Sequence, residues 1–109
     1  MTKKQVFVRT TNFIHSMLQR CSESSGENMS FTLSRLIEME IEAPPTVRPE
    51  MKIAKKKGER FDRRLSFKID EGVWLYFTIH CKNLKIQPAN RVNQILMQFL
   101  ETNRKLWED

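Results

Sequence analysis

Apolar and polar residues alternate in two short segments, one in each half of the chain. The first has the sequence QVFVR (residues 5–9), and the second has the sequence RLSFKI (residues 64–69). Alternation with a period of two over about five residues is typical of a strand with one buried face. One constant offset in sequence relates the two segments, because it carries Gln5 to Arg64 and Arg9 to Lys68. We therefore expect two similar strands.

A helical pattern follows each predicted strand. Residues 10–12 (TTN) and 70–71 (DE) come just after the strands and carry side-chain oxygens that can cap free amides at a helix start. Gly26 is suited to end the first of these helices, because glycine adopts the left-handed backbone conformation at little cost. Apolar residues at helical spacing mark the buried faces. These are Phe13, Ile14, Met17, Leu18 and Cys21 in the first half, and Val73, Trp74, Phe77 and Cys81 in the second.

A second helix is predicted in each half. Asn28 or Ser30 can cap it in the first half, and Gln87-Pro88 can begin it in the second, since proline suits the first helical turn. Its apolar positions recur at the same offset as the strands, as Leu33 and Val92 do. They are Leu33, Leu36, Ile37 and Ile41, then Val92, Ile95, Leu96, Phe99 and Leu100. The order strand, helix, helix is therefore expected twice.

This repeat divides a single domain of 109 residues into four segments. We expect the two strand-helix-helix repeats over residues 4–42 and 63–101, so that the one chain mimics a dimer. Residues 43–62 are interpreted as a basic linker, and residues 102–109 as a helical C-terminal tail. Trp107 in this tail either staples the helix end to the core or contacts a neighbouring molecule.

Pairing of the two strands with each other completes the predicted fold. A lone strand has no partner, whereas an antiparallel pair turns the apolar residues of both strands to one face that helices can cover. We expect an α+β, mainly α, fold in which a two-stranded antiparallel ribbon packs on four helices. The opposite face of the ribbon is polar and cationic, a shape and charge that the major groove of DNA admits. That face presents Gln5, Phe7, Arg9, Arg64, Ser66 and Lys68.

The charge balance favours a polyanionic partner. The chain has 19 Lys and Arg residues against 13 Asp and Glu residues, a net charge of +6, which attracts nucleic acid or an anionic membrane surface. Its longest apolar runs fall far short of the roughly 20 residues of a membrane span, and no signal-peptide pattern opens the chain. We therefore expect a cytoplasmic protein without a membrane partner.

Four residues raise the question of a metal site: His15, Cys21, His80 and Cys81. The neighbours His80 and Cys81 point about 100° apart on a helix, and the chain has no Cys-x-x-Cys or His-x-x-x-His pair. Both cysteines lie in apolar helical patterns, which gives poor support for a disulfide framework. We expect no metal and no cofactor, and interpret these residues as partly buried.

The sequence offers no constellation for catalysis. Glu38, Glu40 and Glu42 alternate on a predicted helix and so cannot converge as paired carboxylates. A nucleophile beside a general base is likewise not evident. We therefore do not expect an enzyme.

Two local motifs carry a resemblance to a known family. The strand has the form Gln-x-x-x-Arg (residues 5–9), and the turn between the first two helices has the form Gly-x-Asn-x-Ser (residues 26–30). Together with the strand-helix-helix order, the chain resembles the ribbon-helix-helix family of DNA-binding proteins, which includes Arc and MetJ. Its tandem arrangement is similar to that of a conjugative relaxosome protein of this family. Phe7 departs from the pattern, because a polar residue is expected there, and residues 85–88 replace the glycine turn.

The resemblance implies a role for each set of polar residues. The outward strand residues are expected to contact base edges: Gln5 at adenine, the cationic residues at guanine or phosphate, and Phe7 at thymine methyl groups. The N-termini of the second helices are expected to contact phosphates through Asn28, Met29, Ser30, Ala89 and Asn90. The linker is expected to add non-specific backbone contacts through Lys55, Lys56 and Lys57.

These roles describe a protein that binds double-stranded DNA through a β-ribbon in the major groove. We expect it to act as a transcriptional repressor of its own operon or as an accessory protein at a plasmid transfer origin, in the nucleoid or on a plasmid of a prokaryote. We expect a folded monomer that associates cooperatively on DNA. One alternative is an antitoxin-like module that binds a protein partner through the linker or tail. Another is a basic RNA-binding fragment.

Overall fold

The computed structural model describes residues 2–42 and 59–108, and the chain forms an α+β fold that is mainly helical, as expected. Within these residues two strands and four α-helices are followed by a short 3-10 helix. Their order is β1 (Lys3–Thr10), α1 (Asn12–Ser25), α2 (Met29–Glu42), β2 (Arg63–Asp70), α3 (Glu71–Asn83), α4 (Pro88–Thr102) and η1 (Arg104–Leu106).

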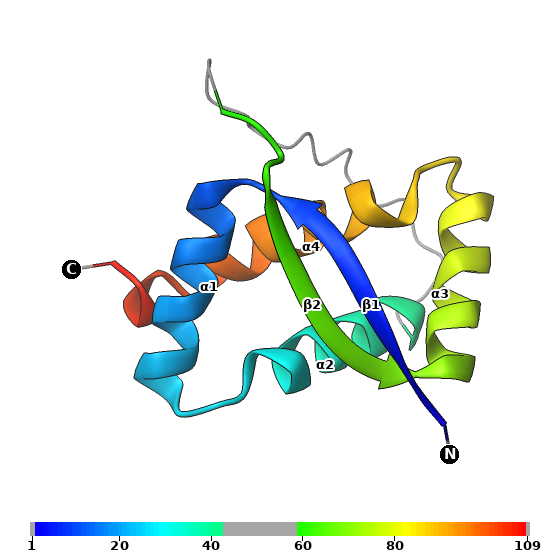
Figure 1. Ribbon diagram of the computed structural model, residues 1–109, viewed down its shortest axis with the longest axis horizontal. Coiled ribbons are helices and arrows are strands. Elements are labelled where there is room, and N and C mark those ends of the chain that lie inside the picture. Colours follow the sequence, from blue (N-terminus) through cyan, green and yellow to red (C-terminus); the bar gives the residue numbers. More distant parts are fainter. Residues whose placement is uncertain (1, 43–58, 109) are drawn as a thin grey trace.

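The two strands pair with each other, which confirms the predicted antiparallel ribbon. Their register runs from Lys3 opposite Asp70 to Thr10 opposite Arg63. Side chains alternate between the two faces of a strand, so the apolar set points to the core and the polar set to solvent. In Figure 1 the ribbon crosses one side of the molecule, with α1 and α3 on either flank and α4 behind it. One face of the ribbon is thus left uncovered.

The buried face of the ribbon and the inner faces of the four helices share one core. Val6, Val8, Leu65 and Phe67 are buried from the strands, and Phe67 packs edge-on against the ring of Trp74. Burial of each such side chain contributes roughly 1.5–3 kcal/mol to stability. The helices supply Ile14, Leu18, Cys21, Leu33, Ile37, Phe77, Cys81, Val92, Ile95, Leu96 and Leu100. These helix residues are all among the predicted apolar positions.

Helix starts coincide with the capping residues in the sequence. The side chains of Thr11 and Asp70 each accept a hydrogen bond from the amide three residues on, at 3.2 and 3.1 Å. Asn28 caps α2 by accepting from the amide of Ser30 at 2.8 Å. Pro88 occupies the first turn of α4. These caps place the helix N-termini directly after the strands or after the turns between helices.

The tail differs from the continuous helix that its pattern predicts. The α-helix ends at Thr102, because Asn103 leaves the helical conformation and donates through its side-chain amide to the carbonyl of Phe99 at 2.8 Å. The 3-10 helix η1 then turns Trp107 back onto α1. Trp107 packs edge-on against Phe13 at 5.7 Å between ring centroids. It therefore fastens the C-terminus to the core, in agreement with the first of its two interpretations.

A buried ion pair and a neighbouring histidine join three helices. The carboxylate of Glu40 on α2 accepts from Nε and Nη2 of Arg91 on α4, at 2.8 and 3.1 Å. His80 on α3 lies 2.8 Å from the same carboxylate through its Nε2. Glu40 and Arg91 are both buried. Two-point pairing of this kind fixes the relative positions of the helices.

Candidate nucleic-acid interface

The structure brings together all six residues predicted to contact bases. They lie on the uncovered face of the ribbon as three cross-strand pairs, and all six are exposed. This follows from the register, because each of them alternates with a buried residue of the core. The pairs are Gln5 with Lys68, Phe7 with Ser66, and Arg9 with Arg64.

The middle of this face has an unusual composition. Phe7 is 55% exposed, although it is a large apolar residue surrounded by polar ones. Its cross-strand partner Ser66 is small and leaves the ring open. The guanidinium carbon of Arg64 lies 4.8 Å from the centre of the Phe7 ring, within the range of a cation–π contact. Phe7 and Arg64 thus form one combined surface.

Arg63 lies at one end of the ribbon, on the side of β2 that also carries Leu65 and that faces α1. Its guanidinium donates to the side-chain oxygen of Asn12 at 3.1 Å and lies 3.2 Å from Nδ1 of His15. Burial, and to a smaller degree the charge of Arg63, hold the pKa of His15 below its usual value. A neutral His15 leaves Nδ1 free to accept from Arg63. The end of α1 nearest the ribbon therefore helps to hold this arginine.

Two polar side chains clamp the outer edges of the ribbon, and sequence reasoning missed both. On one edge, Ser34 of α2 donates to the carbonyl of Lys68 at 3.0 Å. On the other, Asn93 of α4 donates to the carbonyl of Arg9 at 2.9 Å. Asn93 is only 1% exposed and also accepts from the hydroxyl of Thr10. A polar residue among apolar helix positions was the available signal, and it did not reveal the partner.

The predicted phosphate-contacting residues lie where the helices begin. Ser30 is beside the ribbon, because its hydroxyl accepts from the amide of Lys68 at 3.1 Å. Asn28 and Met29 precede it at the start of α2, and Ala89 and Asn90 are in the first turn of α4. A groove joins the start of α2 to the outward strand residues. It is lined by Lys3, Gln5, Asn28, Ser30, Phe31, Ser34, Arg35, Glu38, Ser66, Phe67, Lys68, Ile69 and Asp70.

The linker prediction cannot be placed on the structure. Lys55, Lys56 and Lys57 lie outside the described residues, as does most of the segment 43–62. The contacts of these lysines with the DNA backbone remain a prediction from sequence.

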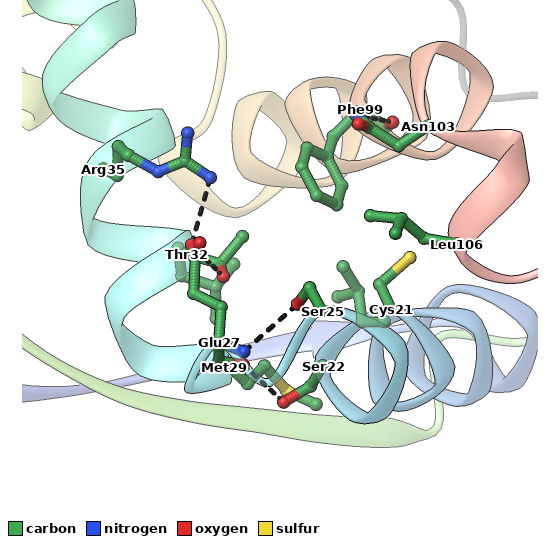
Figure 2. A pocket seen from close by; sticks show the side chains of 12 residues that line it. Cys21, Ser22, Ser25, Glu27, Met29, Thr32, Arg35, Phe99, Asn103 and Leu106 are labelled. Atoms are coloured by element: carbon green, nitrogen blue, oxygen red, sulfur yellow. Dashed lines mark hydrogen bonds and ion pairs between the residues drawn. The ribbon is translucent and has the colours of Figure 1, made fainter.

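A separate cavity of about 230 Å³ lies between α1, α2 and the C-terminal part of the chain. Figure 2 shows Glu27 joined to Thr32 and Arg35 at one side of it, and the Cys21 sulfur directed toward Leu106. The hydrogen bond from Thr32 is the main reason why the pKa of Glu27 is lowered, and Arg35 adds to it. The polar groups around this cavity are thus largely bonded to one another.

The remaining candidate chemistry has a structural explanation. Cys21 and Cys81 are buried free thiols, and burial together with the nearby Glu40 carboxylate raises the pKa of Cys81 to about 11. No three His, Cys, Asp or Glu side chains of the described residues converge as a metal site. Over residues 2–42 and 59–108, none of the helices combines the length and apolar character that a membrane span requires.

Comparisons of the chain with protein-family models, with curated protein sequences and with solved structures found no match. The geometry and charge of the chain itself are therefore the guide to its function. The uncovered ribbon face is the feature that combines exposure, regular spacing and positive charge.

Proposed function

We propose that this protein binds double-stranded DNA in a sequence-specific manner by placing the β1–β2 ribbon in the major groove. The observation that carries the proposal is the uncovered ribbon face with its three outward cross-strand pairs. Glutamine, arginine, lysine and serine side chains can bond to base edges, and a two-stranded ribbon has the width that the major groove admits. These donors are spaced regularly, because each follows the period of its strand.

We further propose that the chain is a tandem ribbon-helix-helix protein. Two clamp contacts support this. The sequence offset that relates the two strands also relates the donors Ser34 and Asn93. It relates the acceptors as well, since Arg9 and Lys68 are equivalent positions of the two strands. This is the relation expected of two repeats that pack as the two halves of a pseudo-dimer.

Helix N-termini give the proposed complex its phosphate contacts. The start of α2 lies at the edge of β2 through Ser30, and the start of α4 lies near β1 through Asn93. A helix N-terminus presents unpaired amides and a partial positive charge, which favour phosphate. With the ribbon in the groove, α2 and α4 would face the two backbones that border it. These contacts position the protein, while the ribbon reads the bases.

The biological role follows from this binding mode in one of two ways. Occupation of the major groove at a promoter would repress transcription, including that of its own operon, and occupation near a plasmid transfer origin would assist DNA processing. Both roles use the same groove contacts. Either role would place the protein in the cytoplasm of a prokaryote, as a monomer that can associate cooperatively on DNA.

Selection of bound duplexes from a random-sequence pool, repeated over a salt series, tests the proposal. We expect a short enriched motif and an affinity that falls steeply with salt, because cationic residues displace counterions from phosphates. Salt-dependent binding without enrichment would refute sequence-specific readout. Equal affinity for single-stranded RNA would favour the RNA-binding alternative.

A charge-matched pair of variants sharpens this test. Removal of Arg64 and Lys68 together, as Arg64→Ala with Lys68→Ala, should lower affinity for the enriched motif by at least 10-fold, at about 1–3 kcal/mol for each lost base contact. The control Lys82→Ala with Lys105→Ala removes two exposed cations outside the ribbon. It should cost much less affinity. Both proteins should melt within a few degrees of the wild type, and a large loss of stability in the ribbon variant would contradict the outward register.

A second candidate function has one observation in its favour. Three large apolar side chains on α3 are exposed: Leu75 at 60%, Tyr76 at 67% and Ile79 at 48%. Exposed apolar side chains gathered on one helix are typical of protein-binding surfaces. An antitoxin-like module would use such a surface for a partner. Failure of all DNA binding in the selection would make this the better hypothesis.

A further inference from the structure

An exposed phenylalanine at the middle of a DNA-facing ribbon requires an explanation. Phe7 does not contribute to the core, because its side chain points away from it and is 55% exposed. Its pair with Ser66 is the middle one of the three outward pairs, between Gln5 opposite Lys68 and Arg9 opposite Arg64. A ring at this place would meet the floor of the groove first. Its chemistry therefore bears on what the ribbon can recognise.

The position of Arg64 adds a donor to this apolar surface. Arg9 lies directly across from Arg64, and like charges in a cross-strand pair repel each other. The guanidinium of Arg64 accordingly extends diagonally over the ring of Phe7, at 4.8 Å from its centre. Stacking on an aromatic face restrains the guanidinium plane. The result is an apolar ring with planar hydrogen-bond donors next to it.

The major groove presents one chemical group that can pack against the Phe7 ring and another that can accept hydrogen bonds from Arg64. The C5-methyl group of thymine is the apolar feature of that groove, and phenylalanine is among the side chains that contact it. Guanine presents the acceptors O6 and N7, which match the two-point donation of arginine. A methyl group and a guanine on adjacent base pairs would therefore satisfy Phe7 and Arg64 together.

We propose that the Phe7–Arg64 pair recognises a 5-methylpyrimidine next to a guanine at the centre of the bound site. The inference rests on the proposed DNA-binding function and adds the chemical group that is read. The methyl group can belong to thymine or to 5-methylcytosine. Phe7 of β1 lies opposite Ser66 of β2, so only one strand of the ribbon carries a ring at this level. The methyl group is therefore read on one DNA strand only. The site is therefore asymmetric at its centre.

The experiment uses the chain of 109 residues and the duplex enriched in the selection. Each thymidine is replaced in turn by deoxyuridine, which removes the C5-methyl group and leaves base pairing intact. We expect one replacement to weaken wild-type binding by about three- to five-fold, the value of one buried methyl group. Cytosine and 5-methylcytosine, paired with guanine at that position, then separate the two sources of the methyl group. If 5-methylcytosine restores the affinity, the methyl group alone is recognised. If only thymidine restores it, recognition also requires the O4 acceptor of thymine.

Two variants assign the effect to the ring. Phe7→Ala should bind the thymidine and deoxyuridine duplexes with equal affinity, while the control Tyr76→Ala, which removes an exposed ring of α3 outside the ribbon, should keep the wild-type difference. Both positions are exposed, so both variants should fold, as a thermal melt will verify. Arg64→Lys should lose the preference for guanine at the neighbouring position, because lysine lacks the planar fork.

The outcomes separate the two proposals. An enriched motif that tolerates deoxyuridine at every thymidine and does not distinguish cytosine from 5-methylcytosine would overturn the methyl-group inference and leave DNA binding intact. A wild-type difference that persists in Phe7→Ala would also overturn it, since another residue would then read the methyl group. Absence of any enriched motif would overturn both proposals.

Discussion

At the scale of single residues, two turns of the chain meet the same backbone requirement with different residues. Gly26 ends α1 at φ 73°, and Lys85 between α3 and α4 has φ 59°, the one positive φ of a non-glycine residue in the described chain. A side chain in this conformation costs roughly 1–2 kcal/mol, and glycine avoids that cost. Lys85 therefore carries strain that Gly26 does not.

Substitutions at these two turns should change the free energy of unfolding in opposite directions. Lys85→Gly should raise the free energy of unfolding by about 0.5–1 kcal/mol, and Gly26→Ala should lower it by about 1 kcal/mol. A β-carbon at Gly26 would meet no atom within 4 Å, so its cost is purely conformational. Urea titration of the three proteins measures both effects. A loss of stability in Lys85→Gly would contradict the strain at that turn.

His15 makes stability depend on pH. Its pKa in the folded protein is lowered, so on acidification the unfolded chain binds the proton first. Stability is thus full above the usual histidine pKa near 6.5 and is lost as the pH falls from there through the folded-state pKa. Denaturant titrations between pH 7.5 and pH 5 should show a decline that is smaller in His15→Gln. Identical declines in both proteins would refute this contribution.

At the scale of elements, local signals and long-range contacts differ in how well sequence predicts them. The strands follow from alternation around Val6 and Leu65, and the helix starts follow from Thr11 and Asp70, because each signal lies within a few residues. Asn93 and the Glu40–Arg91 pair could not be foreseen in this way. Their partners are set by how helices dock, which no local pattern encodes.

Substitutions in the Glu40–Arg91 pair test how much this contact between helices contributes to stability. Arg91→Met should lower the free energy of unfolding by about 3–5 kcal/mol, because it removes the guanidinium that pairs at two points with a buried carboxylate. The double variant Glu40→Met with Arg91→Met removes both charges and should recover most of that loss. Arg104→Ala breaks an exposed pair with Glu108 and should cost less than about 1 kcal/mol. Urea titration of the four proteins gives these differences, and a double variant as unstable as the single one would show that the charges themselves stabilise the helix junction.

At the scale of the whole molecule, the ribbon makes the two halves of the chain depend on each other. β1 and β2 come from different halves, and each is the other's partner in the described sheet. The clamp contacts also cross, since Ser34 holds β2 and Asn93 holds β1. Neither half can therefore bury its strand alone. Because one chain supplies both strands, no second chain is needed to complete the ribbon.

We therefore expect a folded monomer, and a cut within the linker provides the test. The intact protein should sediment as a monomer with a melting temperature that does not change on dilution. A protease site introduced within residues 43–58 would leave two fragments, one carrying β1 and the other β2, that hold together through the ribbon and core. Only after cleavage should the melting temperature fall on dilution, because association then replaces a covalent connection. A melting temperature that falls on dilution before cleavage would mean that strands pair between molecules, and the intact chain would then be an intertwined dimer.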